Sequence, residues 1–275
     1  MGISLAPAPS PPAGAVDPEA VAAAYLARIG ATRPAEGDPA ALRELHRAHL
    51  VAVPYNTLAI HLGEEVTLDE AELLHNIVQR RRGGLCYELN GAFALLLESL
   101  GYRVELLPAQ VYAAGRFNLP YSHIVLRVRD AEGGLWLADV GFGRHSVYPL
   151  ALGTAEDQAD PGGRFRLVET GEGDLDVLRA GRPVYRVDQR ARPLADFEAA
   201  CWWIATSPRS PYARAPICSR LTPEGGRVTL AGRNLTLTTP QGGRTRRDLS
   251  PEEVLPAYRE HFGLDLPREP GHRPD

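Results

Sequence analysis

The chain has 275 residues, 44% of them hydrophobic, with 30 basic and 34 acidic residues and a formal net charge of −4. This length and composition allow a large core in two or three lobes, and the lack of a basic stripe argues against a nucleic acid partner. Every basic residue is arginine, which excludes a lysine Schiff base. No apolar run approaches the roughly 18 residues that cross a membrane, so no membrane partner is expected.

The cysteines and the chain ends set the expected compartment. Cys86, Cys201 and Cys218 are too few and too scattered for a disulfide framework, and they lack the spacing of a zinc site. We therefore expect no metal and a reducing, cytoplasmic setting. Residues 1–16 lack the basic start of a signal peptide, and with the tail 268–275 they are expected to be disordered.

The first hundred residues predict a helical lobe. Asp-Pro pairs at 17–18 and 38–39 each place a capping residue before a proline at the first helical position. The second of these helices must end before Pro54. Thr67-Leu68-Asp69-Glu70 has the pattern of a capping box and predicts a third helix.

The last helix of this lobe begins at a cysteine. Arg82-Gly83-Gly84-Leu85-Cys86 leads into apolar residues at helical spacing, which end at Gly101. Unpaired N–H groups and the helix dipole at this first turn favour an anion, so we expect the pKa of the Cys86 thiol to be lowered. A free cysteine is more often a small buried hydrophobe, and a nucleophile needs a base.

From Tyr102 onward the apolar residues alternate, which predicts a largely antiparallel β-lobe, a sandwich or a barrel. Segment 196–206 is expected to be a helix or a bridge between lobes, with Cys201-Trp202-Trp203 packed in the core. A hairpin and a final capped helix follow. The expected strands cover residues 103–107, 110–113, 122–129, 135–140, 165–169, 175–178, 184–187, 226–231 and 234–239, and the last helix covers 250–263.

Among the eight histidines, His123 is the best candidate for a base. It begins one apolar strand, and Asp139 directly follows the next. If these strands pair through a turn near 132–134, the imidazole and the carboxylate meet at the far end of the hairpin, where a buried carboxylate needs a partner. His46 and His49, by contrast, are expected on or near the solvent-facing side of the second helix. With Cys86, the pair predicts a nucleophile, a base and an orienting group.

Taken together, these residues resemble a known family. The segment from Arg82 to Asn90 is similar to the RGGxCxxxN signature of the arylamine N-acetyltransferases, and His123 and Asp139-Val140-Gly141-Phe142-Gly143 fall where that family has the rest of its triad. The similarity spans about residues 17 to 267.

The resemblance implies an α+β fold with a papain-like Cys-His-Asp site at the junction of three parts. These parts would be an N-terminal helical lobe over 1–100, a central antiparallel β-barrel lobe over 101–205 and a C-terminal α/β lid over 206–275.

The resemblance also implies a ping-pong acyltransferase. Cys86 would take an acetyl group from acetyl-CoA as co-substrate, and an arylamine or arylhydrazine nitrogen would then attack the thioester. His123 would act as general base and later as acid, with Asp139 orienting it. Phe142 and Gly143 would bind the acceptor. The N–H of Cys86 is a natural oxyanion donor at a helix start.

One departure from the family pattern concerns Asn56, and three competing functions stay open. Asn56 stands where the family commonly has a glutamate, so Arg81 and Arg82 need different acceptors or stay solvated. The same fold and triad serve amide synthases, which release a polyketide chain from a carrier protein. A cysteine hydrolase would use a similar triad, and a binding module with a degenerate site would use none of it.

Overall fold

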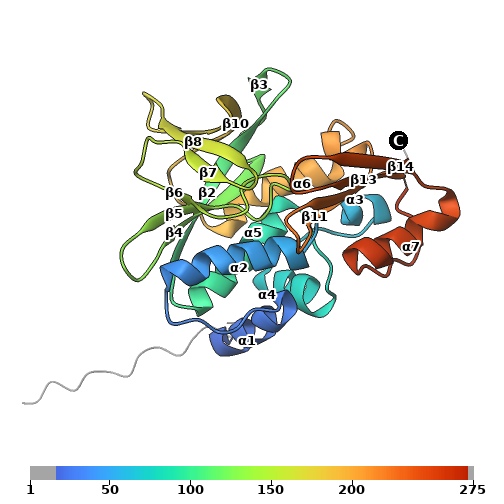
Figure 1. The fold of residues 1–275 in the computed structure, drawn as a ribbon, viewed down its shortest axis with the longest axis horizontal. Helices are drawn as coiled ribbons and strands as arrows, with labels where there is room; N and C mark the ends of the chain where they lie inside the picture. The colour runs from blue at the N-terminus through green and yellow to red at the C-terminus, as the bar shows by residue number, and fades with distance from the viewer. Residues whose placement is uncertain (1–16, 272–275) are drawn as a thin grey trace, which may run out of the picture.

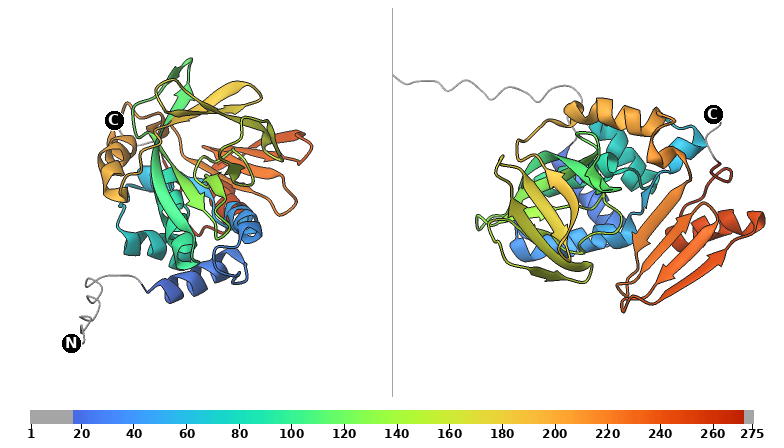
Figure 2. Two further views of the ribbon diagram at one scale, coloured as in Figure 1. Left: turned by 90° about the vertical axis from the view of Figure 1, so that its left-hand side faces the viewer. Right: turned by 90° about the horizontal axis from the view of Figure 1, so that it is seen from above.

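The computed structural model describes residues 17–271, which form the expected α+β fold (Figures 1 and 2). A helical lobe, a nearly closed antiparallel barrel and an α/β lid lie against one another. Residues 1–16 fall outside the described range. Within residues 17–271, every helix is too short or too polar to cross a bilayer.

The helical lobe carries the caps that the sequence predicts, with one correction. The side chains of Asp17 and Asp38 accept hydrogen bonds from the first-turn N–H groups of α1 and α2. The capping box at Thr67 is wrong, because Asp69 is the N-cap and Thr67 instead accepts from the N–H of Asp69. The elements are α1 (Pro18–Ile29), α2 (Pro39–Ala52), α3 (Leu58–Leu62), α4 (Glu70–Leu74), the π-helix η1 (His75–Gln79) and α5 (Cys86–Ser99).

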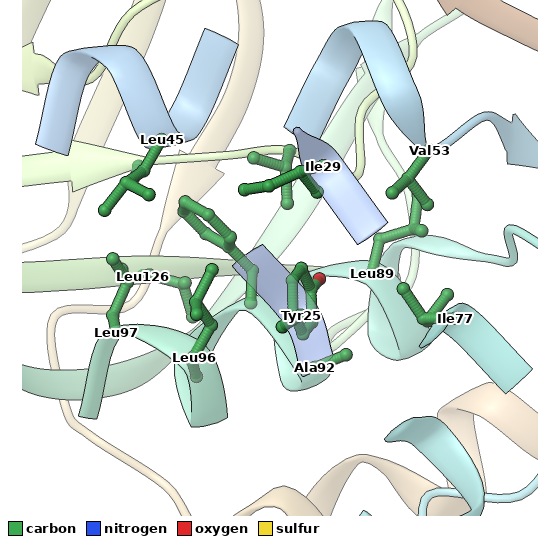
Figure 3. Packing of buried hydrophobic residues seen from close by; sticks show 14 of the residues in the cluster. Tyr25, Ile29, Leu45, Val53, Ile77, Leu89, Ala92, Leu96, Leu97 and Leu126 are labelled. Atoms are coloured by element: carbon green, nitrogen blue, oxygen red, sulfur yellow. The ribbon is translucent and has the colours of Figure 1, made fainter. Parts of the chain in front are cut away.

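Helix α5 lies at the centre of the largest core. Eleven of its 14 residues are buried, so it is held on nearly all sides rather than along one stripe. Figure 3 shows Leu89 and Leu96 of α5 packed among Tyr25 of α1, Leu45 of α2 and Leu126 of the barrel. The cysteine end of the helix is therefore fixed by both the helical lobe and the barrel.

The barrel is one antiparallel sheet in the order β6-β5-β4-β2-β10-β9-β8-β7, with β3 paired to β2. The side-chain amide of Gln158 on β7 joins its two edges, accepting from the N–H of Ala151 on β6 at 2.7 Å and donating to its carbonyl at 2.9 Å. The strands are β2 (Arg103–Ala113), β3 (Arg116–Phe117), β4 (His123–Arg129), β5 (Leu135–Ala138), β6 (Leu150–Ala151), β7 (Gln158–Asp160), β8 (Gly163–Glu169), β9 (Leu175–Arg179) and β10 (Arg182–Val187).

Two short strands expected on either side of Pro108 are in fact one. Strand β2 runs through the proline, which faces Ile124 of β4 across the sheet. Proline is tolerated because Pro108 needs no N–H there, while its carbonyl accepts from the N–H of Asp188 at 2.9 Å.

The lid is a five-stranded antiparallel sheet backed by a helix, and the expected hairpin of β12 and β13 is confirmed. Strand β1 pairs with β11, and Leu58 and Leu62 of α3 pack in the lid core, so a piece of the first hundred residues belongs to the lid. The division at residues 100 and 205 stays a prediction. The elements are β1 (Tyr55–Asn56), β11 (Ile217–Leu221), β12 (Arg227–Ala231), β13 (Asn234–Thr238), β14 (Arg244–Asp248) and α7 (Pro251–Phe262).

The connector between barrel and lid corrects one further expectation, and the segment after α7 corrects another. The connector comprises η2 (Leu194–Phe197), α6 (Glu198–Thr206) and η3 (Pro211–Ala213). Cys201 is buried as expected, but Trp202 is 68% exposed and does not pack in the core. Disorder beyond residue 267 is wrong for Arg268 and Glu269, which bind the carbonyl of Leu62 and the guanidinium of Arg233.

Candidate active site

The β4–β5 hairpin brings His123 and Asp139 together as the sequence predicts. Leu126 pairs with Ala138 and Arg129 with Leu135, so the two strands converge on the far end of the hairpin. There His123 Nε2 lies 2.8 Å from Asp139 Oδ2, and both side chains are almost fully buried. Buried groups of this kind orient each other strongly, because no water competes for the hydrogen bond.

Asp139 is held as a carboxylate by the donors around it. Its Oδ1 accepts from the N–H of Gly141 at 3.0 Å and from Nδ2 of Asn90 at 3.1 Å. Burial alone would raise the pKa of Asp139, but the charge and hydrogen bond of His123, followed by the charge of His145, hold that pKa below its usual range. The group is therefore ionised and able to stabilise an imidazolium at His123.

His46 supports this carboxylate from the helical lobe, which corrects the expectation that it faces solvent. Both His46 and His49 are completely buried. His46 Nε2 accepts from the backbone N–H of Asp139 at 3.2 Å, so Nδ1 carries the proton and donates to the carbonyl of Val147 at 2.9 Å. Burial lowers the pKa of His46, which keeps the ring neutral and preserves this arrangement.

Cys86 is the first residue of α5, and glycines lie on both sides of it in the fold. A Cβ on Gly83 would lie 1.7 Å from the carbonyl oxygen of Pro54, and a Cβ on Gly84 would lie 2.4 Å from Oε2 of Glu88. On the other side, a Cβ on Gly141 would lie 2.7 Å from the Cα of Cys86. The glycines of both motifs therefore allow the close approach of backbone to the cysteine.

The cysteine docks on an unpaired stretch of β4. Strand β5 ends at Ala138, opposite Leu126, so the outer edge of Ile124 has no partner strand. Helix α5 occupies this place, because Asn90 Nδ2 donates to the carbonyl of Ile124 at 2.8 Å and the N–H of Ile124 lies against the Cys86 sulfur. The nucleophile candidate thus contacts the residue next to His123.

The expected lowering of the thiol pKa is wrong for this site. Burial raises the pKa of the Cys86 thiol well above its usual value, and the nearby Cys201 and Asp139 raise it further. The N–H groups of Ile124 and Tyr87 oppose this effect without overcoming it. Desolvation therefore outweighs the helix terminus, and a thiolate here needs a cation beside it.

Cys86, His123 and Phe142 line one cavity of about 190 Å³. The ring of Phe142 lies against that of His123, with centroids 5.2 Å apart. Gly143 does not line the cavity; a Cβ there would face the ring of Tyr55 at 3.4 Å. The remaining lining residues are mostly apolar or aromatic: Tyr55, Leu85, Tyr87, Val111, Gly141, Ile204 and Tyr212.

The departure at Asn56 has a structural answer. Arg82 forms a two-point ion pair with Glu64, with Nη2 2.8 Å from Oε2 and Nη1 3.2 Å from Oε1. Asn56 Oδ1 accepts instead from the N–H of Leu58 at 3.0 Å. The carboxylate that partners Arg82 therefore comes from Glu64, just after α3, and not from residue 56.

Sequence reasoning brings together His123 and Asp139 but assigns no role to His46 or Asn90. Asn90 follows Cys86 by one helical turn and so lies on the same face, which is a usable signal. For His46 the sequence offers none, because its partners lie about a hundred residues away. Across residues 17–271, no cluster of three or more His, Cys, Asp or Glu side chains could hold a metal ion.

Comparison with known proteins agrees with this geometry. A family model described as N-acetyltransferase matches residues 38–270. The arylamine N-acetyltransferase / N-hydroxyarylamine O-acetyltransferase of Salmonella typhimurium is 32% identical over 233 residues, 82% of each chain. A solved structure of the Salmonella typhimurium arylamine N-acetyltransferase superposes with a TM-score of 0.83 at 30% identity, covering 90% of this chain and 92% of that one. The arylamine N-acetyltransferase of Mycobacterium marinum in complex with CoA gives 0.81 at 29% identity, over 89% and 93%.

A buried imidazole–carboxylate pair that shares a cavity with a cysteine at a helix start is the arrangement that the sequence motifs imply. Since a family model covers most of the chain and the relatives align nearly from end to end, this chain is an enzyme of the arylamine N-acetyltransferase family.

Proposed function

We propose that this enzyme transfers the acetyl group of acetyl-CoA to the nitrogen of an arylamine or arylhydrazine, through a thioester on Cys86. The observation that carries the proposal is the shared cavity of Cys86 and His123, with His123 bound to the ionised Asp139. The complex of the Mycobacterium marinum relative with CoA supports a CoA thioester as the acetyl donor.

In the first half-reaction His123 acts as base. Its Nε2–H donates to Asp139, which leaves Nδ1 to accept the proton of the Cys86 thiol. The imidazolium so formed is the cation that the buried sulfur needs. The thiolate attacks the carbonyl carbon of acetyl-CoA, the carbon–sulfur bond to CoA breaks, and the CoA thiolate leaves with the proton from His123.

The N–H of Cys86 supports the tetrahedral oxyanion. This N–H stands at the first position of α5, where the helix itself offers no acceptor. The positive end of the helix dipole adds to the same effect.

In the second half-reaction the amine nitrogen attacks the acetyl carbon on Cys86. His123 takes a proton from the nitrogen, the bond between the carbon and Cys86 breaks, and His123 returns the proton to the sulfur. The mostly apolar, aromatic lining of the cavity, with Phe142 against His123, suits a flat aromatic acceptor. We assign Gly143 to the acceptor loop, because it directly follows Phe142 and holds the chain there at a φ of 82°, a conformation that favours glycine.

We also propose a reducing, cytoplasmic compartment. Within the described residues Cys86, Cys201 and Cys218 are all free thiols, and the proposed chemistry requires Cys86 to remain reduced.

Intact-mass spectrometry tests the assignment directly. Incubation with acetyl-CoA alone should add one acetyl group to the wild-type chain and to Cys201→Ala, whose sulfur is buried near Cys86, but none to Cys86→Ala. Adding an arylamine should discharge the adduct as N-acetyl arylamine.

Three outcomes would contradict the proposal. Acetylation of Cys86→Ala would show that Cys86 is not the nucleophile. Loading by a longer acyl thioester but not by acetyl-CoA would favour an amide synthase supplied by a carrier protein. Discharge to free acetate at the same rate with or without the amine would indicate a hydrolase.

A further inference from the structure

A second cavity, of about 210 Å³, lies where the barrel meets the lid and is lined by three arginines. Arg144 comes from the loop after Gly143, Arg179 ends β9, and Arg227 begins β12. Figure 2 shows the lid sheet beside the barrel, with this junction between them. Segments far apart in the sequence therefore deliver three guanidinium groups to one place.

Within residues 17–271, none of these three arginines forms an ion pair with a carboxylate. Asp160 lies near Arg179 and offsets one of the three positive charges, while its Oδ1 accepts from the N–H groups of Val147 at 2.8 Å and Gly162 at 2.6 Å and its Oδ2 accepts from that of Tyr148 at 3.0 Å. Arg227 finds only the hydroxyl of Ser219, at 3.2 Å. An excess of positive charge thus remains at this cavity.

The three charges act on one another. Burial lowers the pKa of Arg227 to about 10, and Arg144 and Arg179 contribute to this lowering. Burial lowers the pKa of Arg179 as well, with Arg144 adding to the effect. Like charges brought together in a partly buried site destabilise the fold unless an anion joins them, because the low dielectric weakens screening.

We propose that Arg144, Arg179 and Arg227 form a binding site for a phosphate group. A guanidinium offers paired N–H donors that match phosphate oxygens, and three from different directions surround a compact dianion better than a carboxylate. Gly225 also lines the cavity, and nothing lies within 4 Å of the place where its Cβ would be, so this part of the wall is open to close approach.

Two sources of this phosphate are distinguishable. One is the phosphate groups of the acyl-CoA donor, and this source rests on the proposed function. The position of Arg144 in the sequence favours this source, since Arg144 directly follows the loop that carries Phe142 into the active-site cavity. The other is free inorganic phosphate, bound without regard to the reaction.

Thermal unfolding tests the site without using activity. Pyrophosphate should raise the midpoint of the wild-type protein and of Arg246→Gln, an exposed arginine on β14. The rise should fall to less than half in Arg144→Gln and Arg227→Gln. In buffer without phosphate, Arg144→Gln should unfold no lower than wild type, because it removes a repulsive charge. No rise in the wild-type protein, or equal rises in all four, would overturn the proposal.

Steady-state kinetics with two donors identifies the source. If the site holds donor phosphates, the KM for acetyl-CoA should rise at least tenfold in Arg227→Gln, and its preference for acetyl-CoA over S-acetylpantetheine should fall by a similar factor. If free phosphate is the ligand, added phosphate should change the KM for acetyl-CoA and the KM for S-acetylpantetheine by the same factor. Failure of Cys86 to load with acetyl would remove the proposed function but leave the pyrophosphate result intact.

Discussion

Asn90 and Asp139 are bound side chain to side chain across the junction of two lobes. The Nδ2 of Asn90 lies 3.1 Å from Oδ1 of Asp139, and its Oδ1 accepts from the N–H of Val140 at 3.0 Å. The helix that begins with the cysteine thus also holds the carboxylate that orients the histidine. Nucleophile and orienting group are placed by one rigid element.

Asn90→Ala should lower kcat/KM for acetyl transfer by about tenfold to a hundredfold, because Asp139 and the N–H of Val140 each lose a buried partner worth about 1–3 kcal/mol. The measurement is steady-state kinetics together with urea unfolding. Asn234→Ala removes an exposed amide–carboxylate contact in the lid, with Asp248 at 2.8 Å, and should leave kcat/KM unchanged. Equal activity in the two variants would contradict the role of Asn90.

Gly141→Ala should reduce activity more than it reduces stability. Its new Cβ would lie 2.7 Å from both the Cα of Cys86 and the Nδ2 of Asn90, so either the loop or the start of α5 must shift. Displacements of this size at reacting groups cost about a hundredfold in rate. Gly171→Ala meets open space and serves as the matched control. Wild-type kinetics in Gly141→Ala would show that the close approach is dispensable.

His46→Leu should lower kcat about tenfold at a temperature where the variant is folded, because the backbone of Asp139 loses its buried acceptor. His46→Gln keeps an acceptor and a donor and should recover part of the loss, with the pH profile moving back toward wild type. His49→Leu is the control, since His49 binds the hydroxyl of Tyr25 and does not contact Asp139. A purely structural role for His46 would give His46→Leu and His49→Leu the same kinetics.

Glu88 should make the fold less stable as the pH rises. Burial raises the pKa of Glu88 to about 7 from an ordinary 4.5, so the native state holds more protons than the unfolded state between these values. The stabilisation is complete below pH 4.5 and is lost by about pH 7, which corresponds to about 3 kcal/mol at about 1.4 kcal/mol per pKa unit.

Urea unfolding at pH 5 and pH 8 measures this effect. Glu88→Gln keeps an acceptor for the N–H of Leu85 and should lose the fall in stability toward pH 8 that Glu88 contributes, while the contribution of the buried histidines, whose pKa values are lowered, remains. Glu253→Gln changes the corresponding capping residue of α7 and reports the cost of losing such a carboxylate. An unchanged pH dependence in Glu88→Gln would place the titration elsewhere.

The parts of the fold that follow from local pattern were predictable. The alternation around His123 and Asp139 specifies the register of their hairpin, and Asp-Pro pairs specify the starts of α1 and α2. Strand β14, Arg-Thr-Arg-Arg-Asp, was missed because every residue in it is exposed and no apolar pattern marks it. Its register with β13 is instead fixed by backbone pairing.

The errors at the site share a physical cause, which is burial by distant parts of the chain. His46 looks exposed in its own helix, and only the arrival of Asp139 and Val147 buries it. The start of the helix predicts a lowered pKa for the Cys86 thiol. Packing against the barrel removes water from this thiol, and the burial raises the pKa instead. Helical spacing reports on neither.

Strand β5 stops two residues short of Ile124, which leaves the backbone of Ile124 free to bind helix α5. The reactive centre therefore forms only where the helical lobe binds main-chain groups of the barrel. Such recognition uses the backbone of Ile124, and it is lost when helix and barrel separate. During refolding, catalytic competence should therefore return only when helix and barrel have docked, later than the recovery of secondary structure by circular dichroism. The recovery of acetyl-transfer activity therefore reports when the tertiary structure has assembled.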